Sequence, residues 1–466
     1  SYARQIVTLT CPHIGNVGAN DEDIEAQDAY ACGLVVRDYP SLLSNFRSQE
    51  SLSEFLSRHD VVGIDSAIIQ SPQVWVTSGH VGGFSDPLID NKTSKQRYRA
   101  DHLVERKIEK YRKKGRAKDE EALTAKLAAA MNDNAALRDL IIECKIKCPV
   151  SGTDDWTDVR QFNLMFETHV GAMRDSSSVA YLRPETAQGI FINFNNVVTS
   201  SRKKLPFGIA QIGKSFRNEI TPGNFVFRTR EFEQMEMEFF CRPEEAPKWY
   251  AYWQEKRFQW YLDCGVSAEK LRMREHEQDE LAHYADACCD VEYLFPFGWS
   301  ELEGVANRTD YDLKKHSEVS GEHLTWFDQE NNEHITPYVI EPAAGCDRTA
   351  MTFLVDAYDE EGEGKNMRVV LRFHPKIAPV TVAVFPLVKK EGMPEKAAEI
   401  EAMLRPHFRT AIEENQSIGR RYRRQDEIGT PFCITVDGET AEDGCVTLRD
   451  RDCMSQSRVK VEDLVA

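Results

Sequence analysis

The stretch FRNEITPGNFVFRTREFEQMEMEFF, from Phe216 to Phe240, decides the fold, because it contains two alternating segments on either side of a Pro-Gly-Asn sequence. Successive side chains of a strand point to opposite faces of a sheet. In the second segment one face is apolar, with Met235, Met237 and Phe239, and the opposite face carries Arg228, Arg230, Phe232, Gln234, Glu236 and Glu238. In the first segment Gln211, Arg217 and Glu219 share a face, opposite Ile212, Phe216 and Ile220. We predict an antiparallel hairpin that turns at Pro-Gly-Asn.

Two interpretations of the polar face are open. A half-exposed antiparallel sheet normally presents polar side chains to solvent, which is the more common case for one such strand taken alone. This face, however, combines an aromatic ring with arginines and carboxylates. Arginine binds phosphate in a bidentate manner, a ring can stack on a base, and a buried carboxylate can hold an ammonium group. The combination favours a site for a nucleotide and an amino acid.

The composition is that of a globular protein of roughly three domains by length. Of the 466 residues, 41% are apolar and 29% are charged. The longest strongly apolar run, VTVAVFPLV near residue 380, is shorter than the about 18 residues of a membrane span, so we expect no membrane contact. The start does not read as a signal peptide. The twelve cysteines show no disulfide-framework spacing, so we expect a reducing cytoplasm.

A net charge of −18 argues against a nucleic-acid partner for the chain as a whole, because affinity for phosphates comes from lysine and arginine. Local clusters matter more than the sum. There are three basic clusters, Lys107 to Lys118, Arg202 to Lys204, and Arg420 to Arg424. A solvated surface is the better interpretation of the first two, whereas the third, with Tyr422 inside it, is evenly balanced between a surface and an RNA contact.

The chain separates into three regions, residues 1–60, 61–372 and 373–466. Residues 61–372 contain the hairpin, with an insertion at about 88–165 that has charge-dense helices between about 103 and 143. We expect these helices to face solvent, with an acceptor-stem contact as the lesser option. Residues 373–466 begin with VTVAVFPLV, continue through a helix from Glu395 to Phe408, and end with CITVD and CVTLRD. Strand, helix and strand in this order predict a small α/β domain.

Four motifs then carry a family resemblance. They are YLRPETAQGIFINF (181–194), LPFGIAQIGKSFRNE (205–219), FPFGWSELEGVANRTDYDLKKH (295–316) and YVIEPAAGCDR (338–348). From about Val61 onward the chain resembles class II aminoacyl-tRNA synthetases, and among them glycyl-tRNA synthetase of the homodimeric type. The resemblance implies an α+β fold, in which an antiparallel sheet flanked by helices precedes an α/β anticodon-binding domain. It implies a ligase that uses ATP, glycine and tRNA(Gly).

The resemblance also assigns site residues. It implies that Arg217 clamps the α-phosphate, Phe232 stacks on adenine, and Arg348 covers the other face of the base or holds the γ-phosphate. Glu219 fits the acid near the adenine amino group, so Arg217, Glu219 and Arg348 are the expected catalytic residues. The full set expected at ATP is Arg217, Asn218, Glu219, Phe227, Arg228, Thr229, Arg230, Glu231, Phe232, Glu301, Leu302, Gly345, Cys346, Asp347 and Arg348.

Glycine offers no side chain, so selectivity must come from holding its ammonium group and leaving no room for a Cβ. For Glu185, Glu236 and Glu341, each taken alone, an internal salt bridge is the better interpretation, whereas together they would form a substrate cup. Arg99 would pair with the glycine carboxylate. The expected set is Arg99, Glu185, Phe232, Glu233, Gln234, Met235, Glu236, Glu341, Pro342, Ala343, Ala344 and Gly345. Many relatives have serine at position 343. This chain has alanine there, so one hydrogen bond expected around the substrate is missing.

The resemblance raises the question of two metals, magnesium and zinc. Glu301 fits the position that holds magnesium with ATP, since magnesium prefers oxygen ligands and bridges phosphates. Glu303 is as readily a plain surface acid. Relatives with a zinc ribbon carry two Cys-x-x-Cys pairs, where this chain has Asn91 with Ser94 and Cys148 with Ser151. One thiolate from four cannot make a structural zinc site, so we predict no zinc site. Cys144 lies near Cys148 at helical spacing, but two buried thiols are the better interpretation.

The first sixty residues carry a different resemblance. QIVTLTCPHIGNVG and GLVVRD are similar to the amino-terminal domain of the carbamoyl-phosphate synthase small subunit. This segment replaces most of the first class II motif, whose long helix builds the family dimer, and leaves VVGIDSAII (61–69). A helix at Ser51 to His59 could take its place. We interpret Cys11 and Cys32 as core thiols, not nucleophiles.

The replaced motif leaves a second hypothesis open. The chain could be a catalytically impaired hybrid, or a tRNA-binding protein without activity, and its dimerisation is in doubt.

Overall fold

The computed structural model describes residues 61–465 apart from 132, 173, 175–177, 279, 283, 365, 366 and 391. Before residue 61 it describes the backbone of two short strands, β1 (Ile6–Leu9) and β2 (Gly33–Val36), which pair in parallel. The expected helix at Ser51 to His59 and the two cysteines Cys11 and Cys32 lie outside the described residues.

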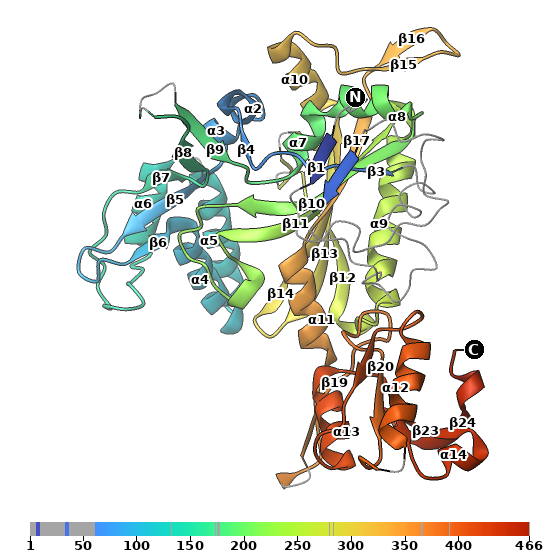
Figure 1. Cartoon of the computed structure of the whole chain (residues 1–466). Helices are drawn as coiled ribbons and strands as arrows, with labels where there is room; N and C mark the ends of the chain where they lie inside the picture. The colour runs from blue at the N-terminus through green and yellow to red at the C-terminus, as the bar shows by residue number, and fades with distance from the viewer. Residues whose placement is uncertain are drawn as a thin grey trace.

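A seven-stranded sheet forms the centre of the molecule, in the order β12-β13-β14-β17-β11-β10-β3. All neighbours are antiparallel except β10 and β3, which are parallel. The strands are β3 (Val61–Gly63), β10 (Phe207–Phe216), β11 (Glu231–Cys241), β12 (Leu271–Glu275), β13 (Ala287–Phe295), β14 (Gly298–Thr309) and β17 (Tyr338–Gly345). The expected antiparallel sheet flanked by helices is therefore confirmed (Figure 1).

The predicted hairpin exists, but its turn is much longer than predicted. Strands β10 and β11 pair from Phe207 opposite Phe240 to Phe216 opposite Glu231, so residues 217–230 form a loop. The loop contains a short 3-10 turn, η1 (Phe225–Phe227), and Asn224 and Phe225 have φ angles of 55° and 56°. Arg217, Glu219, Arg228 and Arg230 therefore lie in the loop, and the period-two assignment of these residues to a strand face was wrong. Their positions depend on the loop backbone.

The two faces of β11 are both buried, which excludes a solvated polar face. Met237 and Phe239 pack against α9 (Ala246–Asp263), together with Trp249 and Trp253. On the other face Glu236 and Glu238 are 4% and 0% exposed. At the far end of that face Phe240 packs against two helices, α7 (Ala187–Ile192) and α8 (Phe194–Ser201).

Other elements complete this domain. Helices α10 (Tyr311–Ser320) and α11 (Cys346–Ala357) follow β14 and β17 directly, and β15 (Trp326–Asp328) pairs with β16 (Glu333–Ile335). A small sheet joins β4 (Ile69–Gln70), β9 (Val179–Leu182) and β8 (Phe166–His169), beside α2 (Pro72–Thr77) and α3 (His80–Gly83). Two 3-10 turns, η2 (Pro243–Glu245) and η3 (Ala268–Lys270), flank α9.

The insertion projects from the side of the sheet (Figure 1). Three helices, α4 (Ala100–Lys113), α5 (Ala117–Ala130) and α6 (Asn134–Glu143), lie beside a sheet of β6 (Arg97–Arg99), β5 (Ser85–Asp90) and β7 (Arg160–Asn163). The helices bury their own core, which includes Leu103, Leu123, Leu137 and Ile141. The predicted helices are confirmed, and solvent faces only one side of each of them.

The carboxy-terminal residues form a five-stranded sheet in the order β21-β20-β22-β23-β24. Its elements are β20 (Val382–Pro386), α12 (Met393–Leu404), β21 (Thr410–Ile412), α13 (Ile418–Ile428), β22 (Phe432–Val436), α14 (Thr440–Asp443), β23 (Cys445–Asp450), β24 (Gln456–Lys460) and η5 (Val461–Asp463). The predicted α/β domain is confirmed, although its helix ends at Leu404, before Phe408. β21, α13 and β24 were not predicted from the sequence.

The basic cluster Arg420 to Arg424 lies on α13, and most of it is used inside the domain. Arg421 is 2% exposed, and its Nη1 donates to the carbonyl oxygens of Pro386 and Glu413. The hydroxyl of Tyr422 bonds with Thr435, and Arg424 pairs with Glu413. The tyrosine and Arg421 are therefore internal supports, not the free surface that an RNA contact requires.

A buried ion network joins the two domains. A hairpin of β18 (Tyr358–Glu361) and β19 (Arg368–Leu371) lies between them. Arg368 on β19 pairs with Asp426 on α13, with Nε 3.0 Å from Oδ2, and Arg449 pairs with the same carboxylate at 2.8 Å. All three side chains are at most 5% exposed.

We expect Asp426→Asn to lower the free energy of unfolding of the carboxy-terminal domain by about 3–5 kcal/mol, because it removes the carboxylate charge that the buried guanidinium groups of Arg368 and Arg449 share. Urea unfolding at constant m-value measures this change. The control is Asp443→Asn, which removes an exposed pair with Arg458 and is expected to cost at most about 1 kcal/mol. Equal effects of the two substitutions would contradict the assigned role.

Candidate functional site

One cavity of about 400 Å³ opens on the polar face of β11, between β14, β17 and the loop 217–230. Seventeen of the residues expected at ATP or glycine line it: Glu185, Arg217, Glu219, Phe227, Arg228, Thr229, Phe232, Glu233, Gln234, Glu236, Glu301, Glu341, Ala343, Ala344, Gly345, Asp347 and Arg348. They come from the hairpin and from three segments far from it in the sequence, which the fold brings to one place.

One end of the cavity is cationic. The guanidinium carbon of Arg217 lies 5.3 Å from the centre of the Phe232 ring, and that of Arg348 lies 4.1 Å from the centre of the Phe227 ring. Arg348 also donates to the backbone oxygens of Glu301 and Phe227, at 2.9 and 3.3 Å. Burial lowers the pKa of Arg348, and Arg217 and Arg228 add to this by like-charge repulsion. Three guanidinium groups this close together suit a polyanion.

The backbone of the loop is held at its base. The amide of Arg217 donates to the carbonyl oxygen of Arg230 at 2.9 Å, and Nε of Arg230 donates to the carbonyl oxygen of Glu219 at 2.9 Å. The amide of Asn218 donates to the carbonyl oxygen of Leu164. Asn218 and Arg230 therefore position the loop but do not line the cavity.

The other end of the cavity is acidic. Oε2 of Glu236 accepts hydrogen bonds from the amide and the hydroxyl of Thr186, at 2.8 and 2.5 Å. Glu341 pairs with Nη1 of Arg308 at 2.8 Å, and Glu185 lies 3.4 Å from Nε2 of His80. These three carboxylates line the cavity and come from β11, β17 and the segment before α7, so the predicted carboxylate cup is assembled.

A fourth carboxylate, Glu238, lies next to this cup. It is fully buried, and neither of its oxygens has a hydrogen-bond partner among the described residues. One oxygen each of Glu236, Glu238 and Glu341 lie within 4.8 Å of one another. Burial raises the pKa of both Glu236 and Glu238 well above the ordinary range, and the charge of Glu341 raises both further. Both carboxyl groups are therefore easier to protonate than exposed glutamates.

Glu185 titrates in the opposite direction. Burial alone would raise its pKa, but His80, Arg308 and a hydrogen bond from Gln188 outweigh burial, and its pKa is lowered. The acidic end therefore holds one firmly ionised carboxylate beside carboxyl groups that are easily protonated.

Eight expected residues lie outside the cavity wall. Two of them, Asn218 and Arg230, position the loop, and the surroundings of the other six explain their exclusion. Leu302 is 1% exposed inside the core beside α9, and Met235 points to the opposite face of β11 from Glu236. Arg99 pairs with Asp86 and Asp101 at the insertion, and Glu231 pairs with Lys214. Pro342 lies opposite Val305 in the sheet, and Cys346 begins α11.

Glu303 is not a surface acid. It is 1% exposed, its carboxylate pairs with Arg257 at 2.5 Å, and it accepts a hydrogen bond from the hydroxyl of Tyr261 at 2.7 Å. It lies on the opposite face of β14 from the cavity, against α9.

Seven lining residues were missed: Val226, His276, Tyr284, Cys288, Asp290, Gly304 and Ala306. Gly304 and Ala306 are small residues opposite Ala343 and Glu341, so they leave room above the cup. Four of these residues could have been predicted from alternation. Cys288 and Asp290 are two residues apart on one strand, as are Gly304 and Ala306 on the next, so each pair shares a face of the sheet. His276 and Tyr284 lie in a connection that has no such pattern.

The four positions related to a zinc ribbon do meet, but hydrogen bonds hold them together. Sγ of Cys148 lies 3.3 Å from the hydroxyl oxygens of both Ser94 and Tyr98, and Ser151 donates its hydroxyl to Oδ1 of Asn91 at 2.9 Å. Burial acts to raise the pKa of Cys148, but the hydrogen bonds from Ser151, Ser94 and Tyr98 outweigh it and lower this pKa to about 6. These positions supply one sulfur, and the absence of zinc there remains a prediction.

Comparisons with known proteins agree with this geometry. Residues 167–358 match the tRNA synthetase class II core domain (G, H, P, S and T), and residues 381–466 match the anticodon binding domain. The fold and the site thus place the chain among the class II aminoacyl-tRNA synthetases. Residues 86–122 and 116–164 match the glycyl-tRNA synthetase insertion domain 1. Residues 1–68 match the CPSase domain of the carbamoyl-phosphate synthase small chain.

The chain belongs to the glycyl-tRNA synthetase family. It is 55% identical to the glycine–tRNA ligase of Clostridium perfringens over 411 residues. This aligned region covers 87% of this chain and 85% of that protein. It is 55% identical over 405 residues to the glycine–tRNA ligase of Staphylococcus haemolyticus, over 86% and 85% of the two chains. The glycine–tRNA ligase of Lysinibacillus sphaericus is 53% identical over 414 residues, or 88% and 86%.

We expect Glu238→Gln to stabilise the protein at alkaline pH. A carboxyl group whose pKa is higher in the folded than in the unfolded chain stabilises the fold below its unfolded pKa, and this contribution is lost as the pH rises through the folded pKa. The amide is not titrated, so the variant should melt at a higher temperature than the parent at about pH 9 and at a similar temperature at about pH 5.

Thermal unfolding across this pH range measures the effect. Glu427→Gln, which neutralises an exposed acid of α13, is the matched control and should leave the pH profile unchanged. A Glu238→Gln profile parallel to that of the parent protein would show that Glu238 is not held as the neutral acid.

Proposed function

We propose that the chain is a glycine–tRNA ligase, which activates glycine with ATP to glycyl-adenylate and transfers the glycyl group to tRNA(Gly). The observation that carries the proposal is the single cavity with three arginines at one end and a carboxylate cup at the other, with residues from one strand, β11, at both ends. The family relationship supports the same reaction.

Activation requires the carboxylate of glycine to approach the α-phosphate of ATP, so the protein must hold two anions together. Arg217 and Arg348 supply the positive charge at this point, from positions fixed by hydrogen bonds to Pro184, Glu301 and Phe227. Preorganised charge of this kind lowers the barrier without reorganisation during the reaction. Phe232, beside Arg217, offers a ring on which adenine can stack.

The acidic end fits the ammonium group of glycine. Glu185 carries the negative charge, and Glu236 and Glu341 surround the same space with carboxyl oxygens. Gly304, Ala306 and Ala343 line the cavity nearby with small or no side chains. A small amino acid therefore fits with its ammonium group in the cup and its carboxylate toward the arginines.

Magnesium accompanies ATP in reactions of this class, and Glu301 is the residue that would hold it. Its side chain lines the cavity, is 55% exposed, and lies 3.6 Å from Arg348. A carboxylate so accessible and so close to the arginine end suits a hard cation that bridges phosphate oxygens. When bound, the ion would neutralise phosphate charge at that end.

The alternative hypothesis of an impaired hybrid or a non-catalytic tRNA-binding protein has less support. The lining residues of β11, β14 and β17 lie in register on paired strands, and the match to glycine–tRNA ligases covers most of the chain. The family dimer, the location in the cytoplasm and the residue-by-residue site assignments remain part of the proposal. No helix in the described part of the chain is both long and apolar enough to cross a membrane.

We expect Arg217→Ala to reduce glycine-dependent exchange of pyrophosphate into ATP by roughly 10²–10³-fold, the loss typical of removing one preorganised donor to a transition state. Arg112→Ala, an exposed site on α4, is the matched control and should retain the parent rate. Size determination of the same preparations reports the oligomeric state. A folded parent chain without exchange would reject the ligase proposal and favour the silent protein.

We expect Ala343→Ser to lower the KM for glycine roughly fivefold, as one added hydrogen bond would. Position 343 lies directly opposite Glu236 in the sheet and lines the cavity, so a hydroxyl there reaches the carboxylate cup. The KM for ATP should not change, and Ala343→Gly, which adds no hydroxyl, should not improve glycine binding. An unchanged KM for glycine in the serine variant would place the substrate elsewhere.

A further inference from the structure

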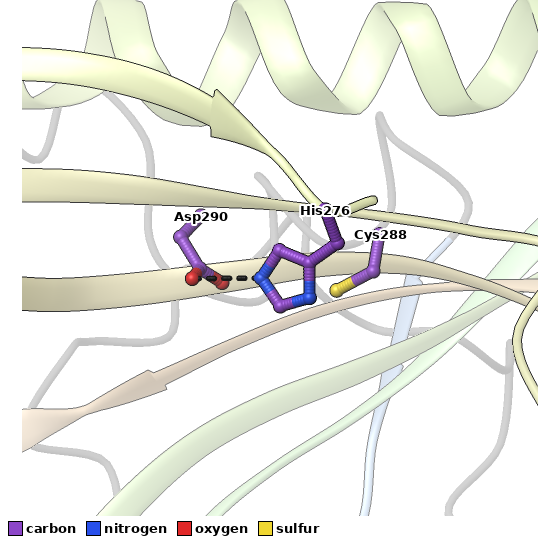
Figure 2. Close-up of side chains that lie close together, drawn as sticks. All are labelled: His276, Cys288 and Asp290. Carbon is purple, nitrogen blue, oxygen red and sulfur yellow. Dashed lines mark hydrogen bonds and ion pairs between the residues drawn. The ribbon is translucent and has the colours of Figure 1, made fainter. Parts of the chain in front are cut away.

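Three side chains that the proposed reaction does not use meet in the wall of the cavity. Cys288 and Asp290 alternate on β13, so they share a face, and His276 directly follows β12, the neighbouring strand. All three line the cavity, and one sulfur, nitrogen or oxygen atom from each lies within 4.8 Å of the other two. Figure 2 shows the imidazole of His276 between the carboxylate of Asp290 and the sulfur of Cys288.

The hydrogen bonding orients the imidazole. Nε2 of His276 lies 2.8 Å from Oδ2 of Asp290, and the other ring nitrogen is on the side of Cys288 (Figure 2). A carboxylate in this position fixes the ring and its tautomer, as it does for histidines that bind metal ions. The lone pair of the second nitrogen then points to the space beside the sulfur.

We propose that His276 and Cys288 bind zinc or another thiophilic divalent cation, and that Asp290 holds the imidazole in place through its hydrogen bond to Nε2. Imidazole and thiolate are ligands that zinc prefers, and the sulfur selects against magnesium. The amide of His276 donates to the carbonyl oxygen of Cys288 at 2.9 Å, so the backbone fixes the spacing of the two ligands. The cavity leaves the remaining coordination positions open to water or to a substrate oxygen.

The site differs from the ribbon positions considered in the sequence analysis. Those positions lie in the insertion and offer one sulfur, whereas this cluster lies in the catalytic domain and offers a sulfur beside an imidazole nitrogen. Arg274 also contacts the carboxylate that positions the imidazole, because its Nη2 lies 3.6 Å from Oδ2 of Asp290. Arg274 pairs with Glu280 and Glu292 as well, and Asp290 keeps its hydrogen bond to His276.

A cation here would affect the nucleotide end of the cavity. Glu301 lines the same cavity as Cys288 and Asp290. In a step that rests on the proposed function, a thiophilic ion would draw Glu301 or a phosphate oxygen to itself and compete with magnesium-bound ATP. The cluster would then make the ligase sensitive to zinc.

Cobalt binding tests the site without reference to activity. We expect the chelator-treated full chain to bind Co²⁺ with a near-ultraviolet sulfur-to-cobalt charge-transfer band, and Zn²⁺ to abolish the band by displacement. Cys288→Ser should remove the band, and Asp290→Asn should weaken binding roughly tenfold or more. Cys289→Ser is the matched control, because this neighbouring sulfur lies on the opposite face of β13 and contacts Gln254. Circular dichroism and thermal unfolding confirm that each variant is folded.

The outcomes are separable. No band at a stoichiometric amount of Co²⁺, or a band that survives Cys288→Ser but disappears with Cys148→Ser, would overturn the proposal. Inhibition of pyrophosphate exchange by Zn²⁺ that Cys288→Ser relieves would support the effect on ATP. A cobalt band in a chain without exchange would retain the metal site and reject only the ligase function.

Discussion

The burial of carboxylates on one face of β11 is the constraint on which the rest of the site depends. Removing an ionised group from water is costly unless an opposite charge compensates it. Arg308 supplies much of that charge: it is 2% exposed, pairs with Glu341 and Asp312, and lies over the ring of Tyr284. Its charge is divided among several acids, and burial raises the pKa of Glu236 and of Glu238, which favours their neutral forms. An ammonium group placed in the cup would provide a positive charge that the fold itself lacks there.

The polarity of the cavity follows from how β11 begins and continues. Its first residues adjoin the loop 217–230, which supplies Arg217 and Arg228, whereas Glu236 and Glu238 lie further along the strand. A substrate with an ammonium group and a carboxylate is therefore oriented by a single strand. In the proposed reaction, phosphates would be drawn to the same end as the carboxylate, where Arg217, Arg228 and Arg348 line the cavity.

The sequence predicted the elements better than their limits. Alternation identified β10 and β11 and the apolar face that packs on α9, because burial on both faces does not change the period of a strand. Alternation wrongly placed Arg217 and Arg228 on strands. These residues lie in a loop that backbone hydrogen bonds close, and the side chains of such a loop do not alternate between two faces. Leu302 and Met235 adjoin site residues in the sequence but point to the opposite face. His276, Cys288 and Asp290 were missed because their proximity depends on the pairing of β12 with β13, which no motif records.

The edge of the sheet shows why the site can be independent of the residues before Val61. Strand β3 pairs with residues 208–210 of β10, and the chain that follows is fixed by side chains. The hydroxyl of Ser66 donates to Oε1 of Gln211 at 2.7 Å, and Arg183 donates to the carbonyl oxygen of Ser66 at 2.7 Å. A Cβ at Gly189 would lie 2.0 Å from the hydroxyl oxygen of Ser66, so α7 approaches this segment as closely as glycine permits. These contacts position α7 and, just before it, Glu185 and Thr186 at the carboxylate cup. The described chain thus carries these supports of the cup within itself.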